Sequence, residues 1–401
     1  ERVLEALLEL FPDAAVHTLV HRAGSVSPAI EARKIHTSFL QRLPWGVHHY
    51  RHYLPLLPRA VESLNVTGSD LVVSTSHAVA KGVRPGAAPH LCYCHTPMRW
   101  AWDQHDEYFG PGRASLPVRI AARAVMPGLR RWDVRTAARV HRFVANSAHV
   151  RERIGRVYGR AASVVHPPVD VDRFRPAPRR EDFYLVVSAL VAYKRVDRAV
   201  DACTRLGRRL VVVGDGPGLG GLQARAGPSV IFAGRVPDPE VARLMGRCRA
   251  LLLPGVEDFG IAVVEARAAG APVVALGAGG ALETVTDLRW DPEGGSGLLI
   301  TEPTVDAFCD ALRLLERLDP DPARVRAGIE RWRKERFLAA MADEVEALTG
   351  RRPPGWERRQ AGEGVRHRVS PGPRPGAGRR PPPGGPCTGR SGPRPELPWV
   401  R

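Results

Sequence analysis

Short apolar runs alternate with segments of helical period along the second half of the chain. We expect helices over residues 196–207, 239–248 and 261–270, and strands over 184–188, 210–213, 230–233, 250–253 and 272–275. Uninterrupted Val, Leu and Ile strands separated by helices are typical of a parallel sheet that is covered on both faces.

The first half of the chain shows the same alternation less regularly. We expect helices over residues 1–10, over 115–142 and after Asn146-Ser147, and strands over 15–20, 66–74, 91–94 and 142–145. A proline-rich stretch, residues 166–182, has the composition of a linker. The predicted fold class is therefore α/β, with two doubly wound domains that bind ligands at the carboxyl ends of their strands, in the cleft between them.

The predicted domain limits are 1–165, a linker over 166–182, 183–349, and a tail over 350–401. The tail holds 12 Pro, 11 Gly and 12 Arg in its 52 residues, a composition that predicts disorder. Its arginines supply about half of the formal net charge of +17, so the rest of the chain is only mildly basic. Its aromatics are Trp356 and Trp399, not the interleaved set of an RNA-binding segment, and we expect no nucleic-acid partner.

The cysteines are scattered and form no CxxC pair. We expect buried thiols in a reduced compartment at Cys92, Cys94, Cys203, Cys248, Cys309 and Cys387. No apolar run approaches the roughly 20 residues that span a bilayer. Metal binding is not favoured, because His48, His49 and His52 are close in sequence but lack a carboxylate partner.

Two glutamates eight residues apart carry the strongest chemical signal. A buried strand ends near residue 253, a loop carries Glu257, Gly260 allows close backbone approach, and a helix that begins near Ile261 carries Glu265. The two carboxylates can flank one ligand, and the N–H groups at the helix start can bind an anion. On spacing alone, a solvated loop acid and an acid that stabilises the helix dipole remain an equally ordinary explanation.

The segment Pro254–Ala266 resembles the E-x7-E motif of the retaining glycosyltransferases of family 4, which have the GT-B fold. Further segments resemble that family in its own order, over about residues 1–349: YCHTPMRWAWD (93–103), ANSAHVRERI (145–154), HPPVDVDRF (166–174), LVVSALVAYKRVDRAVDA (185–202), VVGDGP (212–217), FAGRVPD (232–238) and GGALETV (279–285). The mannosyltransferase-like branch that builds bacterial surface polysaccharides is the most similar.

The resemblance implies a nucleotide-sugar site in the second domain, with Glu257 on the transferred sugar and Glu265 on the ribose. Lys194 is one of only four lysines and suits a diphosphate leaving group. The cation that much of the family carries five positions earlier is here Ala189, so either Arg195 or another cation compensates, or the phosphate clamp is weaker. The remaining donor-binding residues expected are Asp258, Phe259, Gly260, Ile261, Ser188, Arg195, Gly214, Gly216, Arg235, Val236, Gly279 and Gly280.

The resemblance also assigns the first domain to the acceptor. His95, at the end of a strand, is expected to hydrogen-bond the transferred sugar or its phosphate, with Arg99 and Glu1 on the acceptor side. Family members begin with a strand and a glycine-rich loop, and Glu1 matches the acid that closes this loop. We therefore expect the first strand to be missing from this chain, with a weakened first domain.

The expected function is transfer of a sugar, mannose from GDP-mannose, to a glycan or lipid-linked acceptor, without a cofactor or a divalent metal. Arginines between residues 113 and 142 alternate with apolar residues, which favours docking on an anionic membrane surface at the cytoplasmic face. A solvated helix face in an arginine-rich protein explains the same pattern. The alternative function is a non-enzymatic protein that binds nucleotide sugars or polyanions on a degenerate transferase fold.

Overall fold

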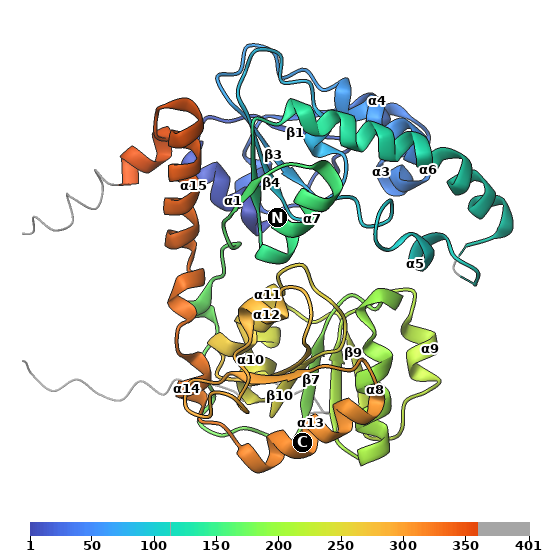
Figure 1. The fold of residues 1–401 in the computed structure, drawn as a ribbon, viewed down its shortest axis with the longest axis vertical. Helices are drawn as coiled ribbons and strands as arrows, with labels where there is room; N and C mark the ends of the chain where they lie inside the picture. The colour runs from blue at the N-terminus through green and yellow to red at the C-terminus, as the bar shows by residue number, and fades with distance from the viewer. Residues whose placement is uncertain (113, 360–401) are drawn as a thin grey trace, which may run out of the picture. The chain divides into compact units, whose positions relative to one another are not determined.

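The computed structural model describes residues 1–112 and 114–359 (Figure 1). Residues 1–356 form one compact unit. Most of the predicted tail lies outside the described residues, but its first part is ordered against the body. Trp356 packs on the cluster formed by α1 (Arg2–Leu10) and α15 (Lys334–Thr349), so the body extends beyond the predicted limit of residue 349.

The strands form three parallel sheets in the described residues. A two-stranded sheet pairs β1 (Val16–Thr18) with β2 (Ile35–Thr37). A four-stranded sheet has the order β3 (Val72–Ser76), β4 (His90–Cys94), β5 (Arg142–Ala145), β6 (Ala162–Val164). The six-stranded sheet has the order β12 (Gly297–Ile300), β11 (Val273–Leu276), β10 (Ala250–Leu253), β7 (Tyr184–Val187), β8 (Leu210–Val213), β9 (Val230–Gly234).

Helices connect the strands and cover the sheets, as the alternating pattern predicts. The longer ones are α6 (Leu116–Thr136), α7 (Ala148–Tyr158), α8 (Val196–Leu206), α10 (Asp238–Arg247), α11 (Ile261–Ala268) and α13 (Val305–Leu318). Shorter helical segments are α2 (Pro28–Glu31), η1 (Phe39–Arg42), α3 (Gly46–His49), η2 (Tyr50–Leu56), α4 (Leu57–Glu62), η3 (Ala80–Gly82), α5 (His105–Phe109), η4 (Ala137–Arg139), η5 (Val171–Arg173), η6 (Ala192–Lys194), α9 (Leu219–Gln223), α12 (Ala281–Thr284), α14 (Pro322–Arg326) and η7 (Ile329–Trp332).

Local sequence explains where the principal helices begin and end. The Ser147 hydroxyl accepts a hydrogen bond from the Val150 N–H at 3.1 Å and caps α7. Gly159 and Gly207 end α7 and α8 in the left-handed region, with φ of 62° each. Helix α1 buries Val3, Leu7 and Leu10, which share one helical face.

The central strands of the six-stranded sheet, called the second sheet below, are apolar and buried. Strands β8, β10 and β11 are buried at every position, as expected for central parallel strands that are covered on both faces. The described cysteines Cys92, Cys94, Cys203, Cys248 and Cys309 are buried free thiols, as predicted. Cys387 lies outside the described residues.

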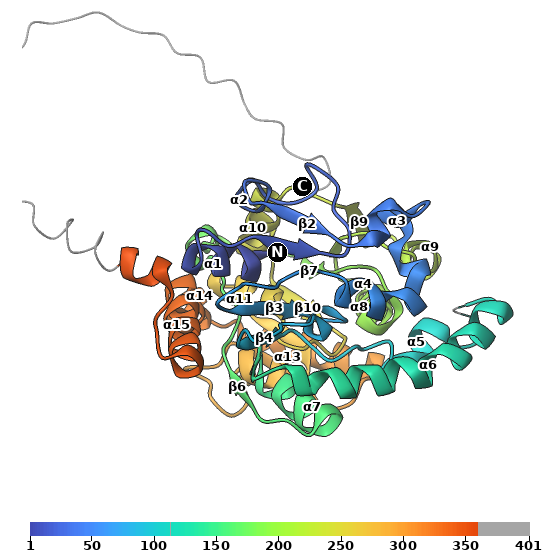
Figure 2. The same ribbon diagram turned by 90° about the horizontal axis from the view of Figure 1, so that it is seen from above.

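Helix α15 departs from the predicted domain limits. It lies within residues 183–349, the range predicted for the second domain, yet Phe337 and Met341 pack with Leu7 of α1 and Tyr93 of β4. Seen from above, α15 and α6 lie on opposite sides of the four-stranded sheet, called the first sheet below (Figure 2). The helical pattern shows that one face of α15 is apolar, but it does not show which sheet that face covers.

Candidate active site

The site lies where the strand order of the six-stranded sheet reverses. Strand β7 has β8 on one side and β10 on the other, and the connections leaving these neighbours run in opposite directions. Such a switch point leaves a crevice outside the carboxyl ends of the two central strands. The loop after β7 carries Lys194, and the loop after β10 carries Glu257.

Lys194 and Glu257 form an ion pair through Nζ and Oε1. Their side chains are only 15% and 16% exposed, so the two charges are largely shielded from water. Close backbone contact holds their loops together, because a Cβ at Gly255 would lie 2.7 Å from the Lys194 carbonyl oxygen. The structure therefore brings together the two residues that the sequence assigns to the leaving group and the sugar.

The glycine pair Gly279-Gly280 supports the Glu257 loop directly. The Gly280 N–H donates to the Glu257 carbonyl oxygen at 2.8 Å, and a Cβ at Gly280 would meet the Cα of Phe259 at 2.4 Å. Glycine is therefore required at residue 280 because the backbone of the Glu257 loop lies so close to it. The Phe259 ring is buried and stacks on the His166 ring at 5.2 Å, so Phe259 can meet a donor only through its backbone.

Glu265 lies within α11, which begins after Gly260 at a φ of 86°. The residue is 7% exposed, and its Oε1 accepts a hydrogen bond from Arg2 of α1. Burial raises the pKa of Glu265, and the nearby Arg2 guanidinium only partly offsets that effect. A buried acid with one oxygen held by a cation keeps its other oxygen available for a hydroxyl.

The loops after β7 and β8 pack tightly on one another. A Cβ at Gly214 would lie 1.9 Å from the Ser188 carbonyl oxygen, and one at Gly216 would lie 2.6 Å from that of Leu190. These glycines therefore allow the loop after β8 to lie close against the loop that carries Lys194.

The two arginines predicted to bind the donor, Arg195 and Arg235, lie in different surroundings. Arg195 forms a bidentate pair with Asp197, at 3.0 and 2.9 Å, and is held at the start of α8. It therefore does not join Lys194 on Glu257. Arg235, with Val236, follows β9, and its side chain is exposed.

His95 follows β4, and its N–H donates to the Ser76 carbonyl oxygen at 2.7 Å. Its ring contacts the edge of the Tyr93 ring, with 5.2 Å between centroids. Burial lowers the pKa of His95 to about 4, so its imidazole is neutral at pH 7.

Arg99, four residues after His95, reaches the Glu257 loop. Its Nε lies 3.1 Å from Asp258 Oδ2, which its Nη2 also contacts. Its guanidinium lies 5.5 Å from the centroid of the Tyr193 ring. The predicted acceptor-side arginine and the predicted donor-side acid are therefore partners.

Arg153 of α7 is a site residue that the sequence did not single out. It is buried, and its Nη1 donates to Asp258 Oδ1 at 2.8 Å while its Nη2 contacts Asp103. Asp258 is thus held by one arginine on each of its oxygens. The only signal was the position of Arg153 inside the ANSAHVRERI motif.

Glu283 is a second residue that the sequence did not identify. Its carboxylate accepts from the Ala148 and His149 N–H groups at 2.9 and 3.2 Å, at the start of α7, and lies 3.1 Å from His166 Nε2. Burial alone would raise the pKa of Glu283, but these hydrogen bonds outweigh it and lower the pKa. This carboxylate therefore ties α12 of the second sheet to α7 of the first.

The Glu1 side chain contacts a different segment. It is exposed and accepts a hydrogen bond from the Ser27 N–H at 2.8 Å. Among residues 1–112 and 114–359, no group of three His, Cys, Asp or Glu side chains could hold a metal ion.

Comparison with known proteins finds a family match in the second half of the chain. Residues 170–332 match the family described as "Glycosyl transferases group 1". Over 234 residues the chain is 33% identical to the GDP-mannose-dependent alpha-(1-6)-phosphatidylinositol monomannoside mannosyltransferase of Mycobacterium tuberculosis H37Rv, covering 49% of this chain and 59% of the relative. Over 254 residues it is 31% identical to the D-inositol 3-phosphate glycosyltransferase of Streptomyces bingchenggensis, covering 53% and 54%. The chain thus matches less than two thirds of the length of these relatives.

Solved structures show the same fold over most of the chain. HepE of Anabaena, in complex with UDP and glucose, superposes with a TM-score of 0.64 at 17% identity, covering 86% of this chain and 95% of that one. Sucrose-phosphate synthase of Thermosynechococcus elongatus gives 0.61 at 19% identity, covering 89% and 92%. The chain therefore has the GT-B fold, and its residues 170–332 match the glycosyl transferases group 1 family.

Proposed function

We propose that this chain is a retaining glycosyltransferase that moves a sugar from a nucleotide diphosphate donor to a glycan or lipid-linked acceptor. The observation that carries the proposal is the contact between Lys194 and Glu257 at the switch point of the second sheet. This contact lies inside the matched range 170–332, at the place where doubly wound sheets bind their ligands.

Each charged group has a distinct role in the proposal. Lys194 neutralises the departing diphosphate, while Glu257 accepts hydrogen bonds from hydroxyls of the transferred sugar. Glu265 holds the ribose through its second oxygen. The rate enhancement comes from positioning and from stabilisation of the leaving group, so the proposal requires no divalent metal, and the acceptor attacks on the face that the diphosphate leaves.

His95 has a role that suits its protonation state. A neutral imidazole both donates and accepts a hydrogen bond, and the pKa of about 4 keeps it neutral at the pH of the cytoplasm. We propose that His95 contacts the sugar or its phosphate from the first domain. A neutral ring orients the donor there without competing with Lys194 for charge.

The relatives guide the choice of donor and acceptor. One is named as GDP-mannose-dependent and acts on a phosphatidylinositol monomannoside, and others are named D-inositol 3-phosphate glycosyltransferases. We propose GDP-mannose as the donor to test first and a lipid-linked glycan as the acceptor, in polysaccharide or glycolipid synthesis.

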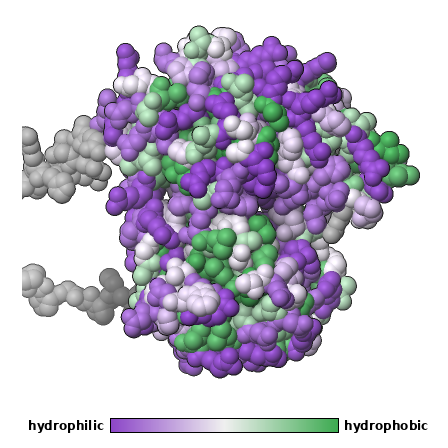
Figure 3. Space-filling view, viewed as in Figure 1, coloured by the Kyte–Doolittle hydropathy of each residue, from purple (hydrophilic) through white to green (hydrophobic). Residues whose placement is uncertain are grey.

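The start of α6 supports a peripheral position at the cytoplasmic face of a membrane. Leu116, Val118 and Ile120 are 64%, 47% and 60% exposed, and an apolar area at the right edge of Figure 3 coincides with this end of α6 in Figure 1. Arg123 is exposed nearby, whereas Arg113 lies outside the described residues. In the described part of the chain, no helix combines the length and apolarity that crossing a membrane needs.

Not every arginine of the predicted basic surface is available to lipid. Arg130 donates to the Ala101 carbonyl oxygen at 2.6 Å, and Arg142 pairs with Glu344. The membrane-facing surface we propose is therefore the first two turns of α6, where apolar side chains can enter the interface beside a cationic group.

Turnover of a panel of nucleotide sugars in the presence of membranes tests the proposal. Release of GDP from GDP-mannose that depends on added lipid acceptor, and that persists in EDTA, is the expected result. Tight binding of nucleotide sugars without release of nucleotide from any of them would instead favour the non-enzymatic binding protein. A strict requirement for a divalent metal would contradict the assigned role of Lys194.

A further inference from the structure

A buried ion pair joins η3 and α6 in the first domain. It lies outside the loops after β7 and β10 that carry Lys194 and Glu257, which we call the donor loops. Asp133 of α6 is fully buried and Lys81 is 1% exposed. The Lys81 ammonium lies 2.8 Å from Asp133 Oδ1, and it donates to the Asp133 carbonyl oxygen at 2.5 Å and to Thr136 Oγ1 at 3.0 Å. Desolvating two charges is costly, and apolar residues of similar volume often give equal stability. The pair therefore calls for an explanation other than stability.

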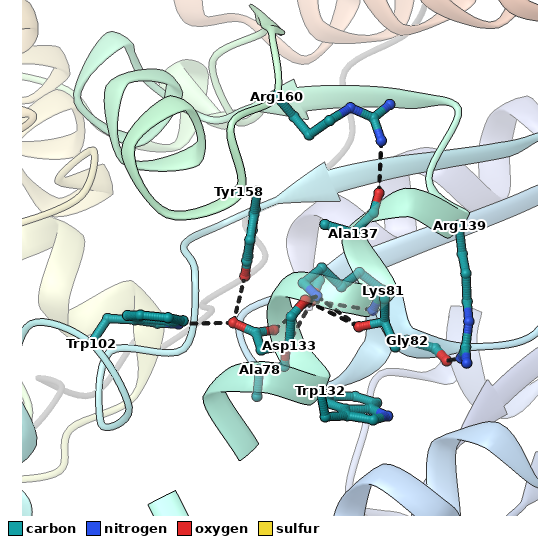
Figure 4. A network of polar contacts seen from close by, with 12 residues as sticks. Ala78, Lys81, Gly82, Trp102, Trp132, Asp133, Ala137, Arg139, Tyr158 and Arg160 are labelled. Atoms are coloured by element: carbon teal, nitrogen blue, oxygen red, sulfur yellow. Dashed lines mark hydrogen bonds and ion pairs between the residues drawn. The ribbon is translucent and has the colours of Figure 1, made fainter. Parts of the chain in front are cut away.

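The second oxygen of Asp133 has a different set of partners. Asp133 Oδ2 accepts from the Trp102 indole N–H at 2.8 Å and from the Tyr158 hydroxyl at 3.0 Å. Figure 4 shows the two side chains reaching this oxygen from two sides. The Lys81 ammonium also lies 4.6 Å from the centroid of the Tyr158 ring. Lys81 thus fixes and neutralises a carboxylate that serves as a common acceptor for two separate segments.

Trp102 belongs to the segment that carries Arg99. The backbone N–H of Trp102 donates to the Met98 carbonyl oxygen at 3.1 Å, and the backbone N–H of Asp103 donates to the Arg99 carbonyl oxygen at 3.1 Å. These bonds make residues 98–103 a short, ordered turn. The Arg130 guanidinium lies 5.6 Å from the centroid of the Trp102 ring, on the same helix as Asp133. The turn is therefore docked on α6 through Trp102.

Tyr158 belongs to the helix that carries Arg153. It is the last residue of α7, and Arg153 lies five positions earlier on the same helix. Arg99 and Arg153 are the two residues that hold the two oxygens of Asp258, the neighbour of Glu257. One oxygen of Asp133 thus anchors both of the segments whose arginines hold the donor loop.

We propose that Asp133 is a positioning residue for the transferase. It sets the spacing of Arg99 and Arg153, and through Asp258 it sets the position of the Glu257 loop. This inference rests on the proposed function for its effect on turnover. The anchoring itself is a property of the folded chain, and it can be measured without a substrate.

Two conservative variants each remove one anchor and leave the charges of the Lys81–Asp133 pair in place. Trp102→Phe removes the indole N–H, and Tyr158→Phe removes the hydroxyl. Trp132→Phe is the matched control, because Trp132 is the neighbour of Asp133 on α6 and its indole N–H donates to the Glu62 carboxylate at 2.9 Å. All three variants lose one hydrogen bond to a carboxylate, but only two of them lose a bond to Asp133.

The expected result is about a 10-fold lower kcat/KM for Trp102→Phe and for Tyr158→Phe, because small displacements of positioning groups cost rate. Trp132→Phe should change kcat/KM less than about 2-fold, even if it lowers the melting temperature as much. In the Asp258→Asn background, Trp102→Phe should cause no further loss of turnover, because the group it acts through is already altered. Equal losses in the Trp132→Phe control, or losses that multiply with Asp258→Asn, would overturn the inference.

Hydrogen–deuterium exchange on the full chain tests the anchoring separately. Trp102→Phe should speed exchange at residues 101–104 and at residues 256–260, and Trp132→Phe should leave both segments unchanged. This result stands even if the wild-type protein turns over no nucleotide sugar, in which case only the proposed function fails. Unchanged exchange at residues 256–260 in Trp102→Phe would overturn the positioning role of Asp133.

Discussion

Removing the charge of Lys194 separates its proposed role in turnover from its role as a counter-ion. Lys194→Met keeps most of the side-chain stem but leaves the Glu257 carboxylate without its cation. Both side chains are about five-sixths buried, so we expect the free energy of unfolding to fall by roughly 2 kcal/mol, less than the 3–5 kcal/mol of a fully buried pair. Turnover should fall about 10²–10³-fold, because stabilisation of the departing diphosphate is lost.

A second substitution distinguishes the two effects. In Lys194→Met/Glu257→Gln a neutral amide replaces the carboxylate. The stability lost in Lys194→Met should therefore largely return, while turnover stays low. Lys334→Met is a matched control, because Lys334 pairs with Glu9 at 3.0 Å between α15 and α1, outside the donor loops. That control should retain its turnover.

The assay pairs chemical unfolding with release of GDP from GDP-mannose, in buffer with and without EDTA. Recovery of turnover in the double variant would refute the reasoning, since it would make Lys194 only a counter-ion for Glu257. Equal loss of turnover in Lys334→Met would refute it as well, because it would show that any lost ion pair is enough.

Three further predictions concern the acid proposed to bind the ribose, a buried histidine and the start of α6. Glu265→Ala should weaken binding of GDP by about 10- to 150-fold in calorimetry, since charge-assisted hydrogen bonds worth roughly 1.5–3 kcal/mol are lost; an unchanged affinity would contradict the ribose assignment. Burial lowers the pKa of His90 to about 4, so the unfolded chain takes up the proton first as the pH falls below 6.5. The free energy of unfolding should therefore drop by up to about 3 kcal/mol between pH 6.5 and 4, and urea unfolding of His90→Asn should show a shallower slope. Leu116→Ser/Ile120→Ser should reduce binding to anionic vesicles in flotation, and unchanged binding would remove α6 from the proposed membrane surface.

Much of the proposed donor side follows from local sequence. Continuous apolar strands end at glycine and charged loops, and parallel strands bring their carboxyl ends to one edge. The positions of Lys194 and Glu257 at the same edge of the sheet could therefore be predicted before any contact was known. The packing of the Gly279-Gly280 pair against the Glu257 loop could not be predicted. A glycine pattern indicates that another group approaches the backbone closely, but it does not identify that group.

The contacts between the two halves could not be predicted from local pattern. Asp258 meets Arg99 and Arg153 across 159 and 105 residues of sequence, and spacing says nothing about such distant partners. Asp133 is the only acid among the many arginines of α6, and this was visible in the sequence. Its burial and its anchoring of two segments depend on the three-dimensional position of α6 beside α7.

The charges of the site pair with one another in this structure, and this restricts what can bind. Lys194 is held by Glu257, and Arg2 is held by Glu265. A ligand that enters between Lys194 and Glu257 has to replace the partner of each, because an unpaired charge in this shielded place is costly. A simple polyanion satisfies Lys194 but leaves Glu257 facing a second negative group. A sugar diphosphate satisfies both, since its phosphates pair with the ammonium while its hydroxyls donate to the carboxylate. The pairing therefore favours a nucleotide sugar over a polyanion, and it predicts that inorganic pyrophosphate should bind much more weakly than GDP-mannose unless Glu257 is replaced by Gln.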